Sequence, residues 1–368
     1  MMRRTPLIWC PGVAWDETAG TDRRLVEAVA ADRAVCWIDP PHARGRAGAP
    51  VAGVDTEVAG VRRFGIAGPP ALTRWPMRAV TDLRRRRLVA DVVARTGAGT
   101  VVVANPLARF PRDARTRVLY VTDDWIAGAP LMRLPRAQIE RTLGRNRDEA
   151  DLVAVVSPAL AADGADVVLP NGVDLAGSAI PARRRERVAG LIGQLNERLD
   201  LDALEALTDA GVPVRVVGAR ADRGGEFGRR LAAFLQHPLV DWRGAVPAAD
   251  VPGHLAEIAV GLTPYADSAF NRASSPLKTY EYLAAGLPVV STDLPASRWL
   301  ASPHVVVAGT AGGFAAAVRR LVDAADSTAA ADARRALAAE HSWQRRAADL
   351  LALIERAERG AALAGGVR

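Results

Sequence analysis

The sequence predicts an α/β protein with two parallel-sheet domains that face each other across a cleft. At 368 residues the chain is long for a single hydrophobic core and suits two domains. Short apolar runs typical of buried parallel strands alternate with helical patterns along its length, which favours helices packed on parallel sheets. Hydrophobic residues make up 49% and charged residues 24%, as expected for a globular protein.

The first domain is expected to open with a βαβ unit, in which a polar loop through Trp15 and Asp16 joins the first strand to a helix. Further apolar runs alternate with helical segments. The run VVLPNGVD at residues 167–174 is expected to be a strand that ends in an Asn-Gly turn. The predicted strands are residues 7–10, 34–38, 58–64, 100–104, 118–122, 153–156 and 167–174, and the predicted helices are residues 23–31, 76–96 and 135–149.

The second domain is expected to follow a polar linker that starts at Pro181. Its predicted strands are residues 188–192, 214–218 and 305–307, with a helix from about Asp200 and a strand, loop, helix and strand from His237. A last helix is expected from Trp343, and the tail from Gly360 is expected to fray. The buried face of this helix is predicted to contain Trp343, Ala347, Leu350, Leu351 and Ile354.

The composition argues against a membrane protein and a secreted one. No apolar run reaches the roughly 20 residues that a membrane span needs. The apolar start of the chain is broken by Pro11 and Gly12, which does not fit a secretory signal. We therefore expect a cytoplasmic protein.

Metal ions and disulfides are not expected. Cys10 and Cys36 lie in strand-like apolar segments and are interpreted as small core residues, and the five histidines lack the spacing of a zinc site. The run Asp200-Leu201-Asp202 resembles a metal-binding DxD motif only superficially. It opens a predicted helix, where acidic residues are expected as caps.

The net charge of +7 permits anionic partners, but no nucleic-acid motif accompanies it, so we expect no nucleic acid. An anionic small molecule or an anionic membrane surface fits better. Arg84, Arg85, Arg86 and Arg87 lie together in a predicted helix. They are interpreted either as a solvated helix face or as a peripheral contact with the inner face of the membrane.

The stretch 271–295, NRASSPLKTYEYLAAGLPVVSTDLP, contains a polar loop, a short helix and a buried strand. Ser275 is suited to cap the helix, Pro276 to its first position and Gly286 to its end. Helical spacing places one set of side chains toward a core and a second set on another face. The first set is Leu277, Tyr280 and Ala284, and the second is Lys278 and Glu281.

The second face has the chemistry of a nucleotide site. Free backbone N–H groups and the helix dipole favour a phosphate at the helix start, and Glu281 can accept hydrogen bonds from a diol. Lys278 is the single lysine among 48 Lys and Arg residues, and a compact ammonium suits a diphosphate. The structural alternative is an ordinary i,i+3 ion pair on a surface helix.

Other candidate residues follow predicted strands, where ligands bind in open α/β sheets. Asp123 and Asp124 follow one strand of the first domain and could meet an acceptor hydroxyl, or they could cap a turn. Gly193 follows a strand of the second domain and allows a ligand to approach the backbone closely.

The run SPLKTYEYLAAGLPVVST resembles the nucleotide-binding signature of GT-B fold glycosyltransferases of the retaining family 4 type, and the PNGVD run is similar to one that closes their first domain. The resemblance implies two Rossmann-like domains. It implies an acceptor-binding domain at residues 1–175, a nucleotide-sugar-binding domain at residues 176–340 and a last helix at residues 341–368 that crosses back to the first domain. It also implies that Glu281 binds the ribose hydroxyls.

The chain departs from the family at two places. Ala273 stands where the family usually has a second glutamate that faces the sugar, and Asp267 or Asn271 could replace it. Gln194 and Leu199 stand where many members have an arginine and a lysine for the diphosphate. Arg198 is either their substitute or a solvent-exposed arginine, and Arg243 is expected near the base.

The expected activity is transfer of a sugar from a nucleoside-diphosphate sugar, of the UDP or GDP type, to an acceptor hydroxyl, with retention of configuration and without a cofactor or an obligatory metal. The acceptor is expected to be a polysaccharide or a lipid-linked precursor, with a small natural product as the alternative. A nucleotide-sugar epimerase and a non-catalytic nucleotide-sugar-binding protein remain rival interpretations. The predicted site comprises catalytic Lys278, Arg198 and Asp124, donor-binding Glu281, Ser275, Leu277, Asn271, Gly193 and Arg243, and acceptor-binding Asp123, Trp15 and Asp16.

Overall fold

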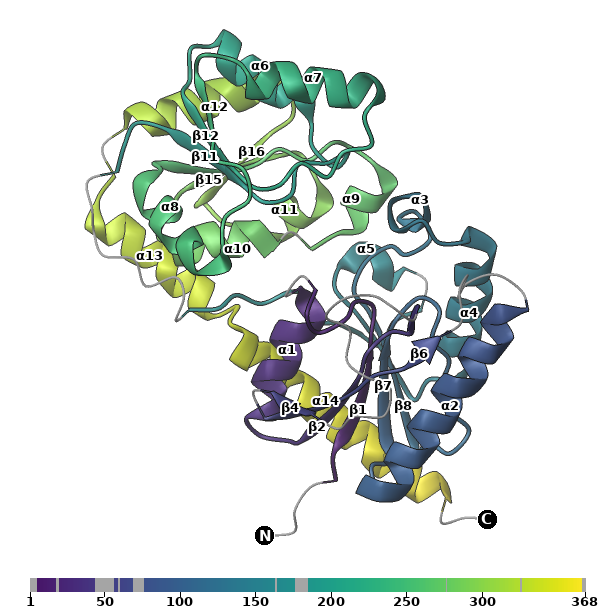
Figure 1. Ribbon diagram of the computed structural model, residues 1–368. Helices are drawn as coiled ribbons and strands as arrows, with labels where there is room; N and C mark the ends of the chain where they lie inside the picture. Colours follow the sequence, from purple (N-terminus) through teal and green to yellow (C-terminus); the bar gives the residue numbers. More distant parts are fainter. Residues whose placement is uncertain are drawn as a thin grey trace. The chain divides into compact units, whose positions relative to one another are not determined.

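The chain forms two compact units in the computed structural model (Figure 1). The first comprises Met1–Pro170 and Trp343–Arg368, and the second comprises Asn171–Ser342. The structure describes residues 5–17, 20–43, 56–58, 60–68, 76–162, 164–175, 185–275, 277–324 and 326–365. Pro181, where a linker is predicted to start, and Pro276, predicted at the first helical position, lie outside the described residues.

The main sheet of the first unit is parallel except at one edge. Its described strands are β1 (Leu7–Pro11), β2 (Val35–Ile38), β4 (Thr56–Val58), β5 (Val61–Phe64), β7 (Thr100–Ala104), β8 (Thr116–Val121), β9 (Leu152–Val155) and β10 (Val167–Val168). They pair in the order β10-β9-β8-β7-β1-β2-β5-β4, and only β4 and β5 are antiparallel. Two further strands, β3 (His42–Ala43) and β6 (Ala67–Gly68), pair in parallel with each other. The predicted βαβ unit and the buried parallel strands are confirmed.

Two predicted strands differ from the observed ones. Residues 58–64 were expected to be one strand, but Gly60 has a φ of 74° and the chain turns there into the β4–β5 hairpin. Residues 167–174 were also expected to be one strand, yet β10 contains only Val167 and Val168. Val173 instead makes an isolated parallel bridge with Ser342 in the second unit.

Helices cover both faces of this sheet. They are α1 (Thr21–Ala30), α2 (Met77–Thr96), α3 (Ala129–Met132), α4 (Arg136–Glu149), α5 (Pro158–Ala161) and α14 (Trp343–Gly365). Helix α14 packs on α1, whereas α2 and α4 lie on the other side of the sheet (Figure 1). The five residues predicted for the buried face of α14 are buried as expected. The fraying predicted from Gly360 is wrong, because α14 continues to Gly365.

The second unit has a fully parallel sheet. Its described strands are β11 (Ala189–Ile192), β12 (Val214–Val217), β13 (Val240–Trp242), β14 (Val260–Thr263), β15 (Val289–Thr292) and β16 (Val305–Ala308). The order is β13-β12-β11-β14-β15-β16, with all pairs parallel. In order of appearance this is 3-2-1-4-5-6, the strand order of Rossmann folds.

Hydrophobic cores lie on both faces of this second sheet, and each face has its own helices (Figure 1). Leu204, Leu231 and Phe314 bring α6 (Leu201–Asp209), α7 (Gly225–Leu235) and α12 (Ala311–Asp323) onto one face. Leu255, Leu283 and Ala338 bring α8 (Val251–Glu257), α10 (Leu277–Ala284) and α13 (Thr328–Ala339) onto the other. The remaining helices are η2 (Ala248–Asp250), α9 (Ala269–Ala273) and α11 (Pro295–Leu300).

Helix α10 is fixed against the sheet by Tyr282, which is fully buried. Its hydroxyl accepts a hydrogen bond from Ile192 N at 2.8 Å and donates one to Gly190 O at 3.2 Å. A Cβ atom on Gly261 would lie 2.2 Å from the Tyr282 ring, so this position in β14 has room only for glycine. Because Tyr282 packs closely on Gly261 and bonds to β11, α10 is fixed against β11 and β14.

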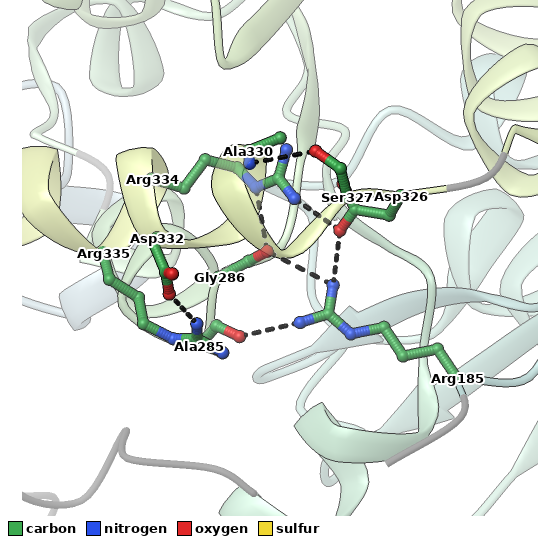
Figure 2. A network of polar contacts seen from close by, with 9 residues as sticks. All are labelled: Arg185, Ala285, Gly286, Asp326, Ser327, Ala330, Asp332, Arg334 and Arg335. Carbon is green, nitrogen blue, oxygen red and sulfur yellow. Dashed lines mark hydrogen bonds and ion pairs between the residues drawn. The ribbon is translucent and has the colours of Figure 1, made fainter. Parts of the chain in front are cut away.

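The other end of α10 is held by two arginines (Figure 2). Arg334 of α13 is buried and donates from Nε to Gly286 O at 2.8 Å. Arg185 donates to Gly286 O and Ala285 O at 3.2 and 3.0 Å, and both guanidinium groups pair with Asp326. Gly286 has a φ of 73°, as expected for a helix-ending glycine. Cationic groups at a helix C-terminus also complement its dipole.

Candidate functional site

The strand order of the second unit places a candidate site between β11 and β14. These two strands are neighbours, and the chain leaves them toward opposite sides of the sheet. In open α/β sheets such a switch point is where ligands bind, beyond the carboxyl ends of the strands. Gly193 follows β11, and the loop that leads to Ser275 and α10 follows β14.

Glycines line the ends of β11, β12 and β13. Gly193 has a φ of 150° and its backbone N donates to Val217 O at 2.9 Å. A Cβ atom on Gly218 would lie 1.7 Å from Gly193 O, so a larger residue does not fit there. Gly218 N donates to Gly244 O at 2.7 Å, which joins the loop containing Arg243 to the same edge. A ligand can therefore approach the backbone closely at Gly193, as the sequence predicts.

Lys278 and Glu281 lie beside this glycine edge. A Cβ atom on Gly193 would be 3.6 Å from the Cε atom of Lys278, an ordinary contact distance. Lys278 Nζ lies 2.6 Å from Glu281 Oε2, and both side chains are partly exposed. Leu277, the first residue of α10, is half-buried beside them. The structure therefore brings together Gly193, Lys278 and Glu281.

Arg198 is held in place by the loop after β14. Its Nε donates to Asn271 Oδ1 at 3.0 Å and its Nη2 to Ser274 Oγ at 3.3 Å. The guanidinium also lies over the rings of Tyr265 and Phe270, at 5.2 and 4.9 Å from their centroids. Cation–π contacts and two hydrogen bonds restrict this side chain, so it is not a freely solvated arginine.

Asn271 joins the segment after β14 to the loop after β11 that contains Arg198. It is 2% exposed, and its Nδ2 donates to Arg198 O and Ala266 O at 2.9 and 2.8 Å. Asp267, the other candidate for the missing family glutamate, is exposed and pairs with Arg272, which lowers the pKa of its carboxyl. Ala273 is buried. Asn271 thus positions Arg198, and no acidic side chain takes the place of Ala273 among these residues.

Ser275 contacts a residue that the sequence interpretation did not assign to the site. Asn171 Nδ2 donates to Ser275 O at 2.6 Å, and Asn171 N donates to Ser275 Oγ at 3.4 Å. Both side chains are buried. Asn171 belongs to the PNGVD run, so this contact joins the two motifs that support the resemblance.

Arg243 lies in the loop after β13, but its side chain is engaged elsewhere. Its Nη2 pairs with Asp241 Oδ2 at 2.7 Å, and the same carboxylate receives a hydrogen bond from Arg215 at 3.1 Å. Burial alone would raise the pKa of Asp241, but the two arginines outweigh this effect and lower it. Contact with a base would require Arg243 to leave this pair.

Two predicted acceptor residues in the first unit have structural partners. Trp15 is 1% exposed and packs edge-on against Trp37, which leaves its side chain little surface for the acceptor contact that the sequence predicts. Its ring also lies beneath the guanidinium groups of Arg23 and Arg63. Asp16 is exposed but pairs with Arg63 at 2.7 Å. The indole of Trp15 lies in the core because a tryptophan side chain buries a large apolar surface.

Asp123 and Asp124 follow β8, at the carboxyl edge of the first sheet. Asp124 Oδ1 accepts hydrogen bonds from Ile126 N and Ala127 N at 3.1 and 2.9 Å. Asp124 therefore caps the turn after β8, which is the structural alternative that the sequence left open.

A cavity of about 170 Å³ lies at the switch point of the first sheet, between the ends of β1 and β7. Gly12 and Asn105 follow these strands, and Asn105 Nδ2 donates to Pro11 O at 2.7 Å. Gln138 of α4 also lines the cavity, and its buried Oε1 has no hydrogen-bond partner among the described residues. The cavity is also lined by Arg78, Asp82 and Arg85. Sequence reasoning missed this site because its residues come from distant elements.

Arg85 differs from its neighbours in the arginine run. Its side chain is 11% exposed, and Nη1 donates to Leu107 O at 3.2 Å. Burial lowers the pKa of its guanidinium, and Asp82 partly opposes this effect. Arg84, Arg86 and Arg87 are exposed. The four arginines therefore do not form one solvated face.

Asp22 of α1 is a buried carboxyl beside this switch point, and it is also absent from the predicted site. Its oxygens accept hydrogen bonds from Trp9 Nε1 at 3.3 Å and Gly12 N at 3.2 Å. Burial raises the pKa of Asp22 to about 7 despite these two hydrogen bonds, and the charge of Asp123 adds to the rise. A carboxyl whose pKa is raised toward neutrality beside the switch point of an open α/β sheet is a candidate functional group.

Comparisons with known proteins support the resemblance. A family model described as "Glycosyl transferase-like" matches residues 197–352. A Bacillus subtilis (strain 168) protein named as a teichuronic acid biosynthesis glycosyltransferase, TuaH, is 36% identical over 120 residues, which span 32% of this chain and 30% of that protein.

Solved structures extend the similarity to nearly the whole chain. Sucrose-phosphate synthase from Thermosynechococcus elongatus has a TM-score of 0.72 at 17% identity and covers 96% of this chain and 99% of its own. Anabaena HepE, solved with UDP and glucose, has a TM-score of 0.62 at 14% identity, with coverage of 96% and 100%. The chain has the GT-B fold. The family match of this GT-B chain includes Arg198, Asn271, Lys278 and Glu281.

The Asp200-Leu201-Asp202 run of the GT-B chain has a structural role. Asp200 caps α6 by accepting a hydrogen bond from Ala203 N at 3.1 Å, and Asp202 pairs with Arg230. Cys10 and Cys36 are both buried, as expected for small core residues. Among the described residues, no group of three or more His, Cys, Asp or Glu side chains could hold a metal ion. None of the helices in the described part of the chain has the length and apolar character to span a bilayer.

Proposed function

We propose that this protein transfers a sugar from a nucleoside-diphosphate sugar to an acceptor hydroxyl in the synthesis of a polysaccharide or glycoconjugate. The observation that supports this most directly is the position of Lys278 and Glu281 beside Gly193 at the switch point of the second sheet. An ammonium, a diol-binding carboxylate and an open backbone are the groups that a nucleoside diphosphate needs.

In the proposed donor complex, the diphosphate lies over Gly193. Lys278 and Arg198 stabilise the negative charge that develops on the leaving diphosphate, and backbone N–H groups near Ser275 add to this. Fixed donors of this kind contribute a few kcal/mol each to the transition state. Asn271 and Asn171 act indirectly, because they fix Arg198 and Ser275 through buried hydrogen bonds.

The proposed base is uracil, with GDP donors as the second choice. Among the similar structures, HepE was solved with UDP and glucose, and an Escherichia coli protein was solved with UDP-2-fluoro-glucose. Glu281 accepts hydrogen bonds from the ribose hydroxyls in this proposal, and the loop of Arg243 contacts the base. We propose retention of configuration and no obligatory metal, in line with the family 4 resemblance.

The acceptor is proposed to bind at the carboxyl edge of the first sheet. The cavity beside Gly12 and Asn105 offers Gln138 Oε1 as an acceptor for a sugar hydroxyl. Asp123 and Asp124 lie at the same edge of the sheet. If Asp124 receives the hydroxyl proton, Asp124→Ala should reduce turnover, and unchanged turnover would exclude that role.

A growing polysaccharide or its lipid-linked precursor is the preferred acceptor, since the name of the Bacillus relative refers to teichuronic acid biosynthesis. A small natural product is the alternative. We place the protein in the cytoplasm, with peripheral membrane contact through exposed Arg84 and Arg87. Flotation with anionic vesicles at rising salt tests this contact, and an absence of salt-sensitive binding would contradict it.

Isothermal titration with UDP, GDP, dTDP and their sugars tests the donor site. Wild type should bind one of these nucleotides, and Lys278→Ala and Glu281→Ala should each weaken the affinity at least about tenfold, since each removes a charge-assisted hydrogen bond. Glu226→Ala is the control, because Glu226 forms an exposed i,i+3 ion pair with Arg229 in the same unit. Failure of every nucleotide to bind the wild type would refute the proposal.

Turnover separates the enzyme from a binding protein. A transferase should release free nucleoside diphosphate from the bound donor when an acceptor is supplied, and slowly to water without one. Tight binding without any release would favour the non-catalytic alternative, which the absence of an acidic residue at Ala273 makes worth testing.

A further inference from the structure

A second cavity in the first unit is lined mainly by arginines. It has a volume of about 290 Å³ and includes Arg86, Arg109, Arg112, Arg117, Arg145 and Glu149. Five guanidinium groups and one carboxylate among these lining residues leave a net excess of four positive charges. An excess of this size in one hollow is a strong attraction for an anion.

The arginines come from four separate segments. Arg86 belongs to α2, Arg145 to α4 and Arg117 to the start of β8, while Arg109 and Arg112 lie in the loop between β7 and β8. Phe110 and Pro111, which are buried, form an apolar wall of the same cavity. The fold therefore gathers these charges into one place, which a run along a single helix face would not do.

The cavity leaves positive charge uncompensated. Glu149 pairs with Arg145 at 2.6 Å. Arg117 has a buried Nε that lacks a hydrogen-bond partner among the described residues. Burial lowers the pKa of Arg109, and the nearby charges of Arg145 and Arg86 lower it further. The mutual repulsion of these arginines is relieved when an anion binds.

From this geometry we propose that the arginine cavity binds a diphosphate or a comparable phosphate-bearing ligand. Guanidinium groups present paired N–H donors that match phosphate oxygens, and several converging forks favour a multiply charged anion over a single carboxylate. The volume is roughly that of ten water molecules, which accommodates a diphosphate. The phosphate could be free or part of a lipid headgroup.

This cavity is separate from the proposed acceptor edge. Arg117 is the second residue of β8, whereas Asp123 lies beyond the other end of that strand. At about 3.3 Å per residue the two are roughly 20 Å apart along the strand. The inference therefore does not depend on the proposed function and concerns a second site.

Pyrophosphate titration monitored by calorimetry tests the proposal, with sodium chloride at equal ionic strength as the reference. The variant Arg109→Gln/Arg145→Gln should weaken pyrophosphate binding at least about tenfold, because two charged donors are lost. Arg141→Gln is the matched control, since Arg141 is an exposed arginine of the same helix that does not line the cavity. Near-native circular dichroism of each variant shows that it is folded.

Pyrophosphate could also occupy the donor site, so Lys278→Ala is measured in parallel. Binding that survives in Lys278→Ala and is lost in the double variant supports the arginine cavity. Binding lost only in Lys278→Ala, or no binding at all, overturns it. These outcomes are independent of nucleotide affinity, which separates failure of this site from failure of the donor site.

Flotation with phosphatidylglycerol vesicles distinguishes the two sources of phosphate. Vesicle binding that pyrophosphate displaces, and that the double variant loses, identifies a lipid phosphate. Pyrophosphate binding without vesicle binding identifies a free phosphate ligand. Vesicle binding that pyrophosphate does not displace, and that the double variant retains, reflects surface arginines alone and overturns the assignment to the cavity.

Discussion

Replacing Asp22 by Asn should make the stability of the first unit less dependent on pH. Asp22 is 6% exposed, and burial is the main reason that its pKa rises from 3.8 to about 7. The folded protein therefore keeps a proton on this carboxyl over a pH range in which the unfolded chain has lost it. Asn has the same shape but does not titrate, so it removes this contribution.

The sign and size follow from the two pKa values. Between about pH 4 and pH 7 the folded state binds more protons at Asp22 than the unfolded state, so the free energy of unfolding falls as pH rises. Each pKa unit corresponds to 1.36 kcal/mol, so a rise of about three units gives a loss of about 4 kcal/mol. Below the lower pKa the contribution is fully present, and above about pH 7 it is fully lost.

Urea unfolding of both proteins at several pH values measures this difference. Trp9, Trp15 and Trp37 are buried in the first unit, so their fluorescence reports its unfolding. The free energy of unfolding of Asp22→Asn minus that of wild type should increase by about 4 kcal/mol from about pH 4 to pH 8. Other titrating groups contribute equally to both proteins and cancel in the difference.

The amide introduced by Asp22→Asn cannot accept both hydrogen bonds that the carboxyl accepts from Trp9 and Gly12, which subtracts about 1 kcal/mol at every pH. The diagnostic quantity is therefore the slope of the difference and not its absolute value. Asp32→Asn, at an exposed residue of the same unit, is the control for loss of one carboxylate. A difference that stays constant with pH would refute the assignment of a proton to buried Asp22.

Two further predictions concern the supports of α10. Gly261→Ala should lower the free energy of unfolding by about 1–3 kcal/mol through overpacking, because the added Cβ would meet the Tyr282 ring. Thermal unfolding measures this change, and a stability equal to that of wild type would show that α10 can move away. Arg334→Gln should lower the free energy of unfolding by about 1–3 kcal/mol, because Gly286 O and Asp326 lose a buried charged partner. A melting temperature equal to that of wild type would show that Arg185 alone holds this end of α10.

Much of the fold could be predicted from local patterns. Uniformly apolar runs such as residues 100–104 specify buried parallel strands, because both of their faces must be covered. Gly286 specified the end of α10, since its positive φ suits a helix terminus. The hairpin at Gly60 was missed because an apolar run with a glycine is compatible with one bent strand or with two.

The candidate site divides in the same way. Lys278 and Glu281 could be predicted because the loop and the helix that contain them are contiguous in the sequence. Gly193 could be predicted because it directly follows an apolar run typical of a strand. Asn171 was missed because its contact with Ser275 joins residues that are 104 positions apart. The arginine cavity was missed for the same reason. The run at residues 84–87 suggested a solvated face or a membrane contact, but only Arg86 of this run lines the cavity.

The ion pair between Lys278 and Glu281 is compatible with both the structural and the functional interpretation of α10, because its free energy is small. A partly exposed pair of this kind contributes at most about 1 kcal/mol, and an i,i+3 pair a few tenths. A diphosphate can therefore attract Lys278 at little cost and leave the carboxylate of Glu281 to accept hydrogen bonds from a diol. The buried contacts of Tyr282, Arg334 and Asn171 hold the backbone of α10 and its preceding loop, so on this helix the proposed donor site requires only Lys278 and Glu281 to move.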